Sequence, residues 1–162
     1  GECQLATPRE LNYSEILQMA EEYYNSKLHK AKRHYGHYLL DYSEKDYTYS
    51  TFDLHQTVEH LLKAIPLVFI LYGHKEHVLK FLIEKCKAYT LELAKVFPCD
   101  TEEEKHLFEL LERSYIEARY NNNFVVPKEV VDALVPKVDL LFSIVDDVCR
   151  KQFDYYKQKS KK

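Results

Sequence analysis

The residues best suited to chemistry lie in two segments of the chain. On a helical wheel at about 100° per residue, residues 52–63 have an apolar side and a polar side. The polar side combines an aromatic ring, an amide, a carboxylate and an amine, with a histidine at each edge. Its members are Phe52, Gln56, Glu59 and Lys63, flanked by His55 and His60. This stripe suits a polar ligand or a partner helix, and the alternative is the ordinary solvated face of an amphipathic helix.

The second segment, residues 112–124, ends in a run of asparagines. Tyr115 and Arg119 are four residues apart and therefore share one face of a helix. A guanidinium is a planar fork that suits phosphate, while the rings of Tyr115 and Tyr120 and the amide of Asn122 could stack on or hydrogen-bond a base. The alternative is structural: Arg119 pairs with a carboxylate, and the asparagines form the turn that ends the helix.

The elements that position these residues are predicted to be helices. The first is expected from a capping box at Asn12 and Glu15 to about Tyr42. Its buried stripe recurs at three- and four-residue steps. The stripe consists of Leu17, Ala20, Tyr24, Leu28, Ala31, Tyr35, Tyr38 and Tyr42. The tyrosines are interpreted as an aromatic helix–helix seam with polar tips.

Two further helices are expected in the middle of the chain. The second begins near Ser50 or Thr51, bends at Pro66 and ends at Gly73. The third covers residues 74–97, and the proline that follows closes it.

The last two helices carry the second chemical segment and the C-terminus. One opens with the acidic turn of residues 100–104 and reaches about Asn121. After a break, the other covers residues 128–157, with a kink or restart at Pro136. Long helices with short connections predict an all-α fold, an up-and-down antiparallel bundle of four long helices plus a short extra helix.

The length of 162 residues fits one domain. The expected parts are an N-terminal extension at residues 1–12, the helical bundle at residues 13–157 and a basic tail at residues 158–162. Because the chain begins with Gly1 rather than Met, we expect an expression remnant attached to one domain of a longer protein.

Composition limits the partners and the compartment. A net charge of −3 means that any contact with nucleic acid must be local. The longest apolar stretch, residues 64–72, is too short for a bilayer, which needs about 20 residues, so no membrane partner is expected. The 4 cysteines are scattered, with no paired spacing, which predicts neither disulfides nor a metal site and favours the cytoplasm. No cofactor is expected.

Three segments, in this order, resemble the HEPN domain family. Residues 52–64 resemble its second-helix pattern of Gln, Glu and Lys-Ala, and residues 77–79 resemble its His-x-Leu step. Residues 115–120, Tyr-Ile-Glu-Ala-Arg-Tyr, resemble its Tyr-x-x-Ala-Arg-Tyr signature. The resemblance covers roughly residues 13–153, and it is to the bacterial type associated with minimal nucleotidyltransferases. It implies a homodimeric module that binds a nucleotide or RNA and works with a nucleotidyltransferase domain or subunit.

The same resemblance implies that the usual catalytic histidine is missing. Active ribonucleases of the family use an arginine followed four to six residues later by a histidine, in a dimer. Arg119 matches the arginine, but Phe124 and its neighbours occupy the histidine position, and no histidine follows His106. Neither Asn nor Phe can perform that proton transfer. The expected mechanism is therefore recognition, with Arg119 on phosphate, a tyrosine on the base, and the polar stripe fixing the ligand or the partner helix.

Two alternatives remain open. One is a toxin-like, metal-independent endoribonuclease in which His55 or His77 replaces the absent histidine. The other is a purely structural dimerisation bundle, which a buried pairing of Arg119 with a carboxylate would favour.

Overall fold

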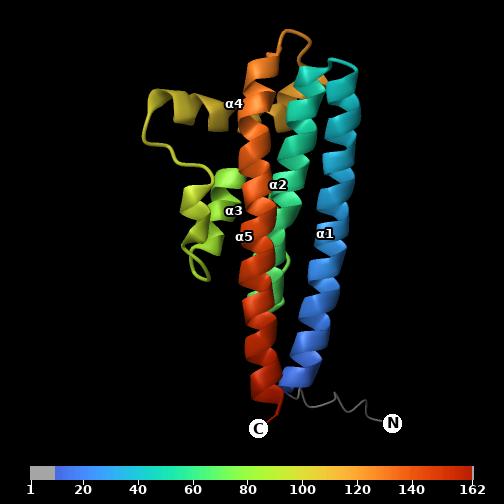
Figure 1. The fold of residues 1–162 in the computed structure, drawn as a ribbon, viewed down its shortest axis with the longest axis vertical. Helices are drawn as coiled ribbons and strands as arrows, with labels where there is room; N and C mark the ends of the chain where they lie inside the picture. Colours follow the sequence, from blue (N-terminus) through green and yellow to red (C-terminus); the bar gives the residue numbers. More distant parts are fainter. Residues whose placement is uncertain (1–9, 162) are drawn as a thin grey trace, which may run out of the picture.

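The computed structural model describes residues 10–161, and this part of the chain consists of helices without a strand (Figure 1). The expression remnant expected at Gly1 and the thiol of Cys3 lie outside the described residues. The four long helices are α1 (Tyr13–Ser43), α2 (Tyr47–Ile70), α4 (Glu102–Tyr120) and α5 (Lys128–Ser160), and the short ones are α3 (Leu79–Cys86) and the 3-10 helix η1 (Glu92–Lys95). This confirms the predicted all-helical bundle of four long helices and a short one. In Figure 1, α1, α2 and α5 lie side by side, whereas α4 crosses them near one end.

The first helix begins and packs as its sequence predicts. Asn12 accepts a hydrogen bond from the backbone N of Glu15 at 2.9 Å, and the reciprocal bond completes the capping box. Ala20, Tyr24 and Ala31 of the predicted stripe are buried. One face of α1 therefore packs on the core along the helix.

Tyrosine hydroxyls join α1 to α5. The three pairs are Tyr24 with Asp146 at 2.5 Å, Tyr35 with Asp139 at 2.8 Å and Tyr42 with Asp132 at 2.6 Å. Each ring fills space between the helices while its hydroxyl donates to a carboxylate. The tyrosine-rich seam is thus both an apolar contact and a ladder of polar contacts.

The second helix starts earlier and ends earlier than predicted. Asp46 accepts a hydrogen bond from the backbone N of Tyr49 at 3.0 Å, so the helix begins at Tyr47 rather than near Ser50. It ends at Ile70, and Leu71 adopts the left-handed conformation, with φ of 55°, that was expected of Gly73. The helix is continuous through Pro66, and residues 52–63 of the polar stripe all lie within it.

The prediction of one long third helix over residues 74–97 is wrong. Residues 71–78 are irregular, α3 ends at Cys86, and η1 follows after a turn in which the side chain of Thr90 accepts from the backbone N of Glu92. Leu82 and Leu93, from these two pieces, are both buried in one core. The periodic apolar pattern is real, but tertiary packing divides it between two short helices.

The last two helices follow the prediction closely. Thr101 and Glu104 form a capping box at the start of α4, which runs to Tyr120. The final helix, α5, is continuous through Pro136, so the predicted restart is wrong, and it extends to Ser160, beyond the predicted end at residue 157. A bend at Pro136 or Pro66 stays a prediction.

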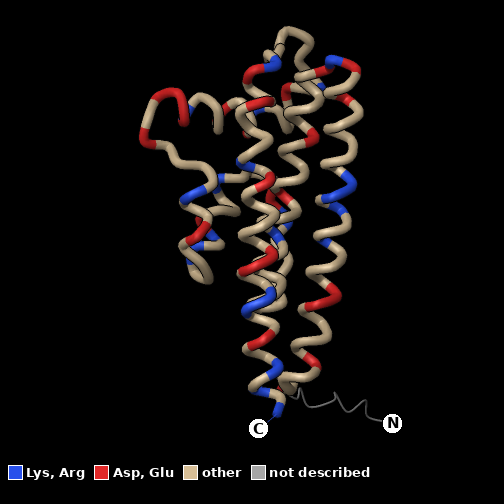
Figure 2. Tube along the Cα trace, viewed as in Figure 1, with Lys and Arg blue, Asp and Glu red and all other residues tan. Residues whose placement is uncertain are grey.

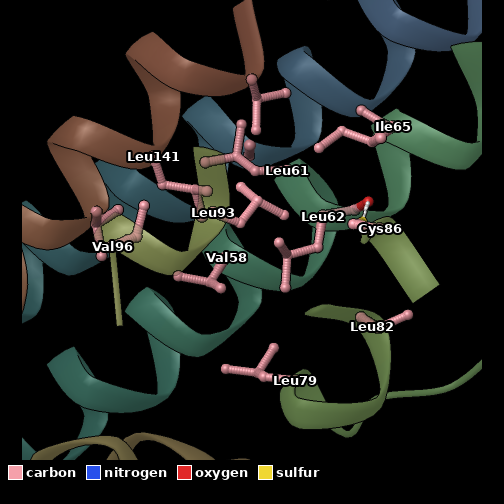
Figure 3. Close-up of a cluster of buried hydrophobic side chains, with 14 of the residues drawn as sticks. Val58, Leu61, Leu62, Ile65, Leu79, Leu82, Cys86, Leu93, Val96 and Leu141 are labelled. Carbon is pink, nitrogen blue, oxygen red and sulfur yellow. Dashed lines mark hydrogen bonds between the residues drawn. The ribbon is translucent and has the colours of Figure 1, made fainter. Parts of the chain in front are cut away.

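The core lies where α2 meets its neighbours (Figure 3). Side chains from α2, α3, η1 and α5 converge there: Val58, Leu61, Leu62, Ile65, Leu79, Leu82, Cys86, Leu93, Val96 and Leu141. The thiol of Cys86 donates to the backbone O of Leu62 at 3.4 Å, and burial raises its pKa to about 12. The helices of residues 10–161 include none long and apolar enough to span a bilayer.

Candidate functional site

The end of α4 holds an arginine among aromatic rings. The guanidinium carbon of Arg119 lies 4.6 Å from the ring centroid of Tyr115, 5.1 Å from that of Phe52 and 5.1 Å from that of Tyr120. We call these four residues the Arg119 cluster. Phe52 comes from α2, and its ring stacks on Tyr115 with centroids 6.4 Å apart. The structure therefore brings the two chemical segments of the sequence together.

The guanidinium of Arg119 is exposed and is held by its own helix. Its Nε and Nη2 both donate to the backbone O of Tyr115, at 2.8 and 2.5 Å. Within residues 10–161 no carboxylate lies at ion-pair distance, so the alternative in which Arg119 pairs with a carboxylate is wrong. The Arg119 cluster thus presents a guanidinium that lies on aromatic rings and has no carboxylate partner among the described residues.

The polar stripe of α2 turns inward. The exposed fractions are only 3% for Glu59 and 5% for Lys63, so the alternative of a fully solvated stripe is wrong. The Nζ of Lys63 donates to Glu59 Oε2 at 3.0 Å, and Nδ1 of His77 lies 2.9 Å from Glu59 Oε1. Burial raises the pKa of Glu59, but the hydrogen bonds from His77 and Lys63 outweigh it and hold the pKa below its ordinary value. Glu59 is therefore a buried carboxylate between two basic partners.

His77 links this buried carboxylate to the Arg119 cluster. Its side chain is 48% exposed, and its ring stacks on Tyr115 with centroids 4.7 Å apart. A carboxylate on Nδ1 orients an imidazole and leaves Nε2 free to face outward. From the sequence, His77 was predicted only as part of the family resemblance and as a substitute catalyst. Its place beside Glu59 was missed because the irregular segment that positions it was predicted to be helical.

His55 and Gln56 lie behind the cluster. The ring of His55 is buried and stacks on Tyr115 at 5.0 Å, and Gln56 Nε2 lies 3.3 Å from His55 Nδ1. On its other side, His55 Nε2 is 3.6 Å from Glu112 Oε1. His55 thus packs against the inner face of Tyr115, and Gln56 contacts His55. Gln56 itself is half-buried.

Sequence reasoning missed the role of Glu112. Its two carboxylate oxygens accept from the backbone N of Leu79 and of Lys80, at 2.8 and 3.1 Å, and so cap the start of α3. Burial raises the pKa of Glu112, but the hydrogen bonds from His55 and from these two amides outweigh burial. The pKa of Glu112 is therefore below its ordinary value. Val78 at the helix start offers no capping side chain, and this was the one available signal that a distant residue must cap α3.

Among the described residues, Asn122 makes no hydrogen bond to the other predicted site residues. It is exposed in the turn after α4, where Asn121 Oδ1 accepts from the backbone N of Asn123 at 3.0 Å. The alternative in which the asparagines form a turn is therefore confirmed. The described residues also lack any group of three His, Cys, Asp or Glu side chains placed to hold a metal ion.

The arrangement can bind an anion against a ring. An exposed guanidinium over aromatic faces suits a phosphate beside a base. The neighbouring imidazole, held by a carboxylate, could donate or accept a proton at such a phosphate.

Comparison with known proteins places these features in a family. No curated protein matches the sequence significantly. The model of the HEPN domain matches residues 24–148, which span α2, α3 and α4 and contain the whole Arg119 cluster. Since this match covers most of the 162 residues, the chain belongs to the HEPN domain family.

Proposed function

We propose that this HEPN domain binds a nucleotide or RNA through the Arg119 cluster and acts by recognition rather than turnover. The observation that carries the proposal is the exposed guanidinium of Arg119, stacked among three aromatic rings without a carboxylate partner in the described chain. An unpaired surface cation that is already ordered loses little side-chain freedom when phosphate binds.

Each part of the site has a distinct role in this proposal. Arg119 contacts phosphate, and Tyr120, whose side chain is 75% exposed, stacks on the base. The buried Glu59, itself held by Lys63, keeps His77 in place. His55 and Gln56 keep Tyr115 flat beneath the guanidinium.

Isothermal titration with a panel of nucleoside monophosphates and short oligonucleotides tests this function. The Arg119→Ala variant is expected to weaken binding about 10- to 100-fold, the range for a hydrogen bond to a charged group. Arg113→Ala is the matched control: Arg113 is exposed on the same helix and contacts an aromatic ring, but it is already paired with Glu117 at 2.7 Å. Absence of heat with every ligand in the panel would remove the proposal.

We also propose that the domain works as a cytoplasmic homodimer with a bacterial-type minimal nucleotidyltransferase, on the same chain or a separate one. Exposed apolar side chains beside the site support a second copy, since Ile116 is 59% exposed one turn of α4 before Tyr120. Light scattering of the purified protein tests the dimer, and Ile116→Asp is expected to give monomers. The support for a nucleotidyltransferase is the resemblance alone, and a Gly-Ser and Asp-x-Asp motif in the natural protein or in its co-purifying subunit would establish it.

A second function, metal-independent RNA cleavage, is favoured by one contact: Nδ1 of His77 lies 2.9 Å from the buried Glu59, next to the ring that carries Arg119. In this scheme His77 takes the proton of a ribose 2′-hydroxyl as its oxygen bonds to phosphorus. The bond to the 5′ oxygen breaks, His77 returns the proton to that oxygen, and Arg119 stabilises the charge on the phosphate.

RNA incubated with the purified protein decides between the two functions. Cleavage that is lost in His77→Ala and in Arg119→Ala, but kept in the control His106→Ala, would establish the ribonuclease. Intact RNA with wild-type protein that nevertheless binds it would leave recognition as the function.

A further inference from the structure

The middle of α1 is strongly basic in a chain whose net charge is negative. Residues 23–40 contain no Asp or Glu, although the whole chain has 26 of them. Figure 2 shows Lys and Arg along this stretch of α1, whereas acidic residues appear only toward the two ends of the helix. At about 100° per residue, Lys27, Lys30, His34 and His37 fall on one flank, with Arg33 at its outer edge.

This flank faces α2, which adds further basic groups. The rings of His34 and His60 stack with centroids 5.2 Å apart and an interplanar angle of 7°. Lys63 also lies close enough to lower the pKa of Lys27. We call the following residues the basic cluster: Lys27, Lys30, Arg33, His34 and His37 of α1, with His60 and Lys63 of α2.

The charges of the basic cluster repel one another. Burial, followed by the charges of Lys30 and Lys63, lowers the pKa of Lys27. Burial, followed by the charge of Lys27, lowers the pKa of His60 to about 4. The carboxylate that faces both groups is Glu59, which already holds Lys63 and His77. Glu59 therefore neutralises Lys63 within the basic cluster, whereas the exposed Lys30 and Arg33 have no carboxylate at ion-pair distance among residues 10–161.

Two cations of α5 are treated differently. On α5, Arg150 pairs with Asp146 at 2.9 Å and Lys151 pairs with Asp147 at 3.0 Å. The described residues contain no such partner for Lys30 or Arg33 of the basic cluster. An ordinary solvated helix face carries both signs of charge, as α5 does, so the single sign on α1 points to an anionic partner.

Contacts of buried side chains join the basic cluster to the Arg119 cluster. Lys63 binds Glu59, Glu59 binds His77, and the ring of His77 stacks on Tyr115. Tyr115 carries the guanidinium of Arg119. This chain of contacts runs beneath the surface, through the buried Lys63 and Glu59, and it places the two clusters on neighbouring parts of α2.

We propose that the basic cluster binds the backbone phosphates of a single RNA strand, one nucleotide of which occupies the Arg119 cluster. The position of that nucleotide rests on the proposed function. The proposed ligand is a strand of RNA rather than a mononucleotide. Residues 27–37 rise by about 15 Å along the helix, a length over which more than one phosphate of a strand can be contacted. Basic groups beside aromatic rings are the usual means of holding a single strand, since unpaired bases stack on the rings.

Fluorescence anisotropy with a labelled 12-nucleotide oligouridylate, with uridine monophosphate as competitor, tests this assignment across a salt series. Wild-type protein is expected to bind the oligonucleotide at least about tenfold tighter than the monophosphate. The double variant Lys30→Ala/Arg33→Ala is expected to lose most of that difference while keeping its affinity for the monophosphate. The slope of log Kd against log salt should fall by about 1.4, which corresponds to two phosphate contacts on a single strand. Arg150→Ala/Lys151→Ala, two neutralised cations on α5, is the matched control and should behave as wild type.

The outcomes separate this inference from the proposed function. If Lys30→Ala/Arg33→Ala binds the oligonucleotide as wild type does, the inference is overturned while binding at Arg119 stands. If Arg119→Ala changes nothing but the double variant loses the oligonucleotide, the α1 surface stands and the proposed function fails. Stronger binding to phosphatidylserine vesicles than to RNA, lost in the double variant, would overturn the inference in favour of a membrane surface. An unchanged unfolding midpoint of the double variant shows that any loss is not unfolding.

Discussion

The two flanks of α1 differ in how their polar groups are satisfied. On the flank toward α5, the hydroxyls of Tyr24, Tyr35 and Tyr42 each donate to a carboxylate. On the flank toward α2, Lys27, Lys30 and Arg33 have no carboxylate at ion-pair distance among residues 10–161, and Glu59, the carboxylate near Lys27, is already paired with Lys63. Groups that are fully paired within the chain stabilise the fold, whereas groups of one sign left unpaired cost stability and favour an external partner. The same helix therefore serves structure on one side and, we infer, binding on the other.

The largest expected effect comes from Glu59, which lies beside the unpaired flank but is itself buried and paired. Glu59→Ala leaves the amine of Lys63 buried without its partner, which should lower the free energy of unfolding by about 3–5 kcal/mol. Chemical denaturation measures this change. The double variant Glu59→Met/Lys63→Met is the control, because it removes both charges and should recover most of the loss. Equal destabilisation by the single and the double variant would contradict a role for charge pairing.

The tyrosine ladder should give a smaller loss. Tyr24→Phe removes the hydroxyl that donates to Asp146 and should cost about 1–2 kcal/mol, since the ring and its packing are retained. Tyr42→Phe should cost less, because its bond to Asp132 is exposed to solvent. Thermal and denaturant unfolding of the two variants would show whether the more buried hydrogen bond contributes more stability. A larger loss in Tyr42→Phe than in Tyr24→Phe would contradict this expectation.

Acid should act on the α2 flank through His60. Because burial and Lys27 lower the folded-state pKa of His60 from 6.5 to about 4, the folded protein favours the neutral ring. The resulting stability is present above about pH 6.5 and is lost as the pH falls toward 4. The unfolding midpoint should therefore drop between pH 7 and pH 4.5, and it should drop less in His60→Asn. The same pH dependence in wild type and variant would show that protonation of His60 does not cause the loss of stability in acid.

The smallest effects should have opposite signs on α1 and α5. Lys30→Gln removes repulsion from Lys27 and from nearby basic residues and is expected to raise the free energy of unfolding by about 0.2–0.5 kcal/mol. Lys151→Gln removes a favourable pair with Asp147 and is expected to lower it by a similar amount, about 0.3 kcal/mol. Paired denaturation curves at low salt check the signs, and high salt should erase both differences.

The candidate site was partly predictable from local spacing. The wheel placed Phe52, Glu59 and Lys63 on one side of α2, and the four-residue step placed Tyr115 and Arg119 on one side of α4. Local spacing does not say which way a polar stripe turns. Glu59 and Lys63 are buried because α1 and the segment that carries His77 cover them.

His77 and Glu112 illustrate what periodicity misses. The apolar pattern of residues 74–97 predicts one helix, but α3 starts only at Leu79, where Glu112 caps it from another helix. That late start leaves His77 in an irregular segment, close to Glu59 and Tyr115. A cap supplied from a distant part of the chain leaves only a negative signal at the helix it begins, here the lack of a capping side chain at Val78.

The sequence by itself determined the helical class, the capped starts of α1 and α4, and the family, because these depend on local hydrogen bonds, on residue spacing and on short motifs. Only the tertiary structure decided which charged residues are neutralised by partners in the chain, because the energy of a charge depends on what surrounds it in space. It buried Glu59 between Lys63 and His77, it left Arg119 exposed on its rings, and it gathered the basic residues of α1 against those of α2.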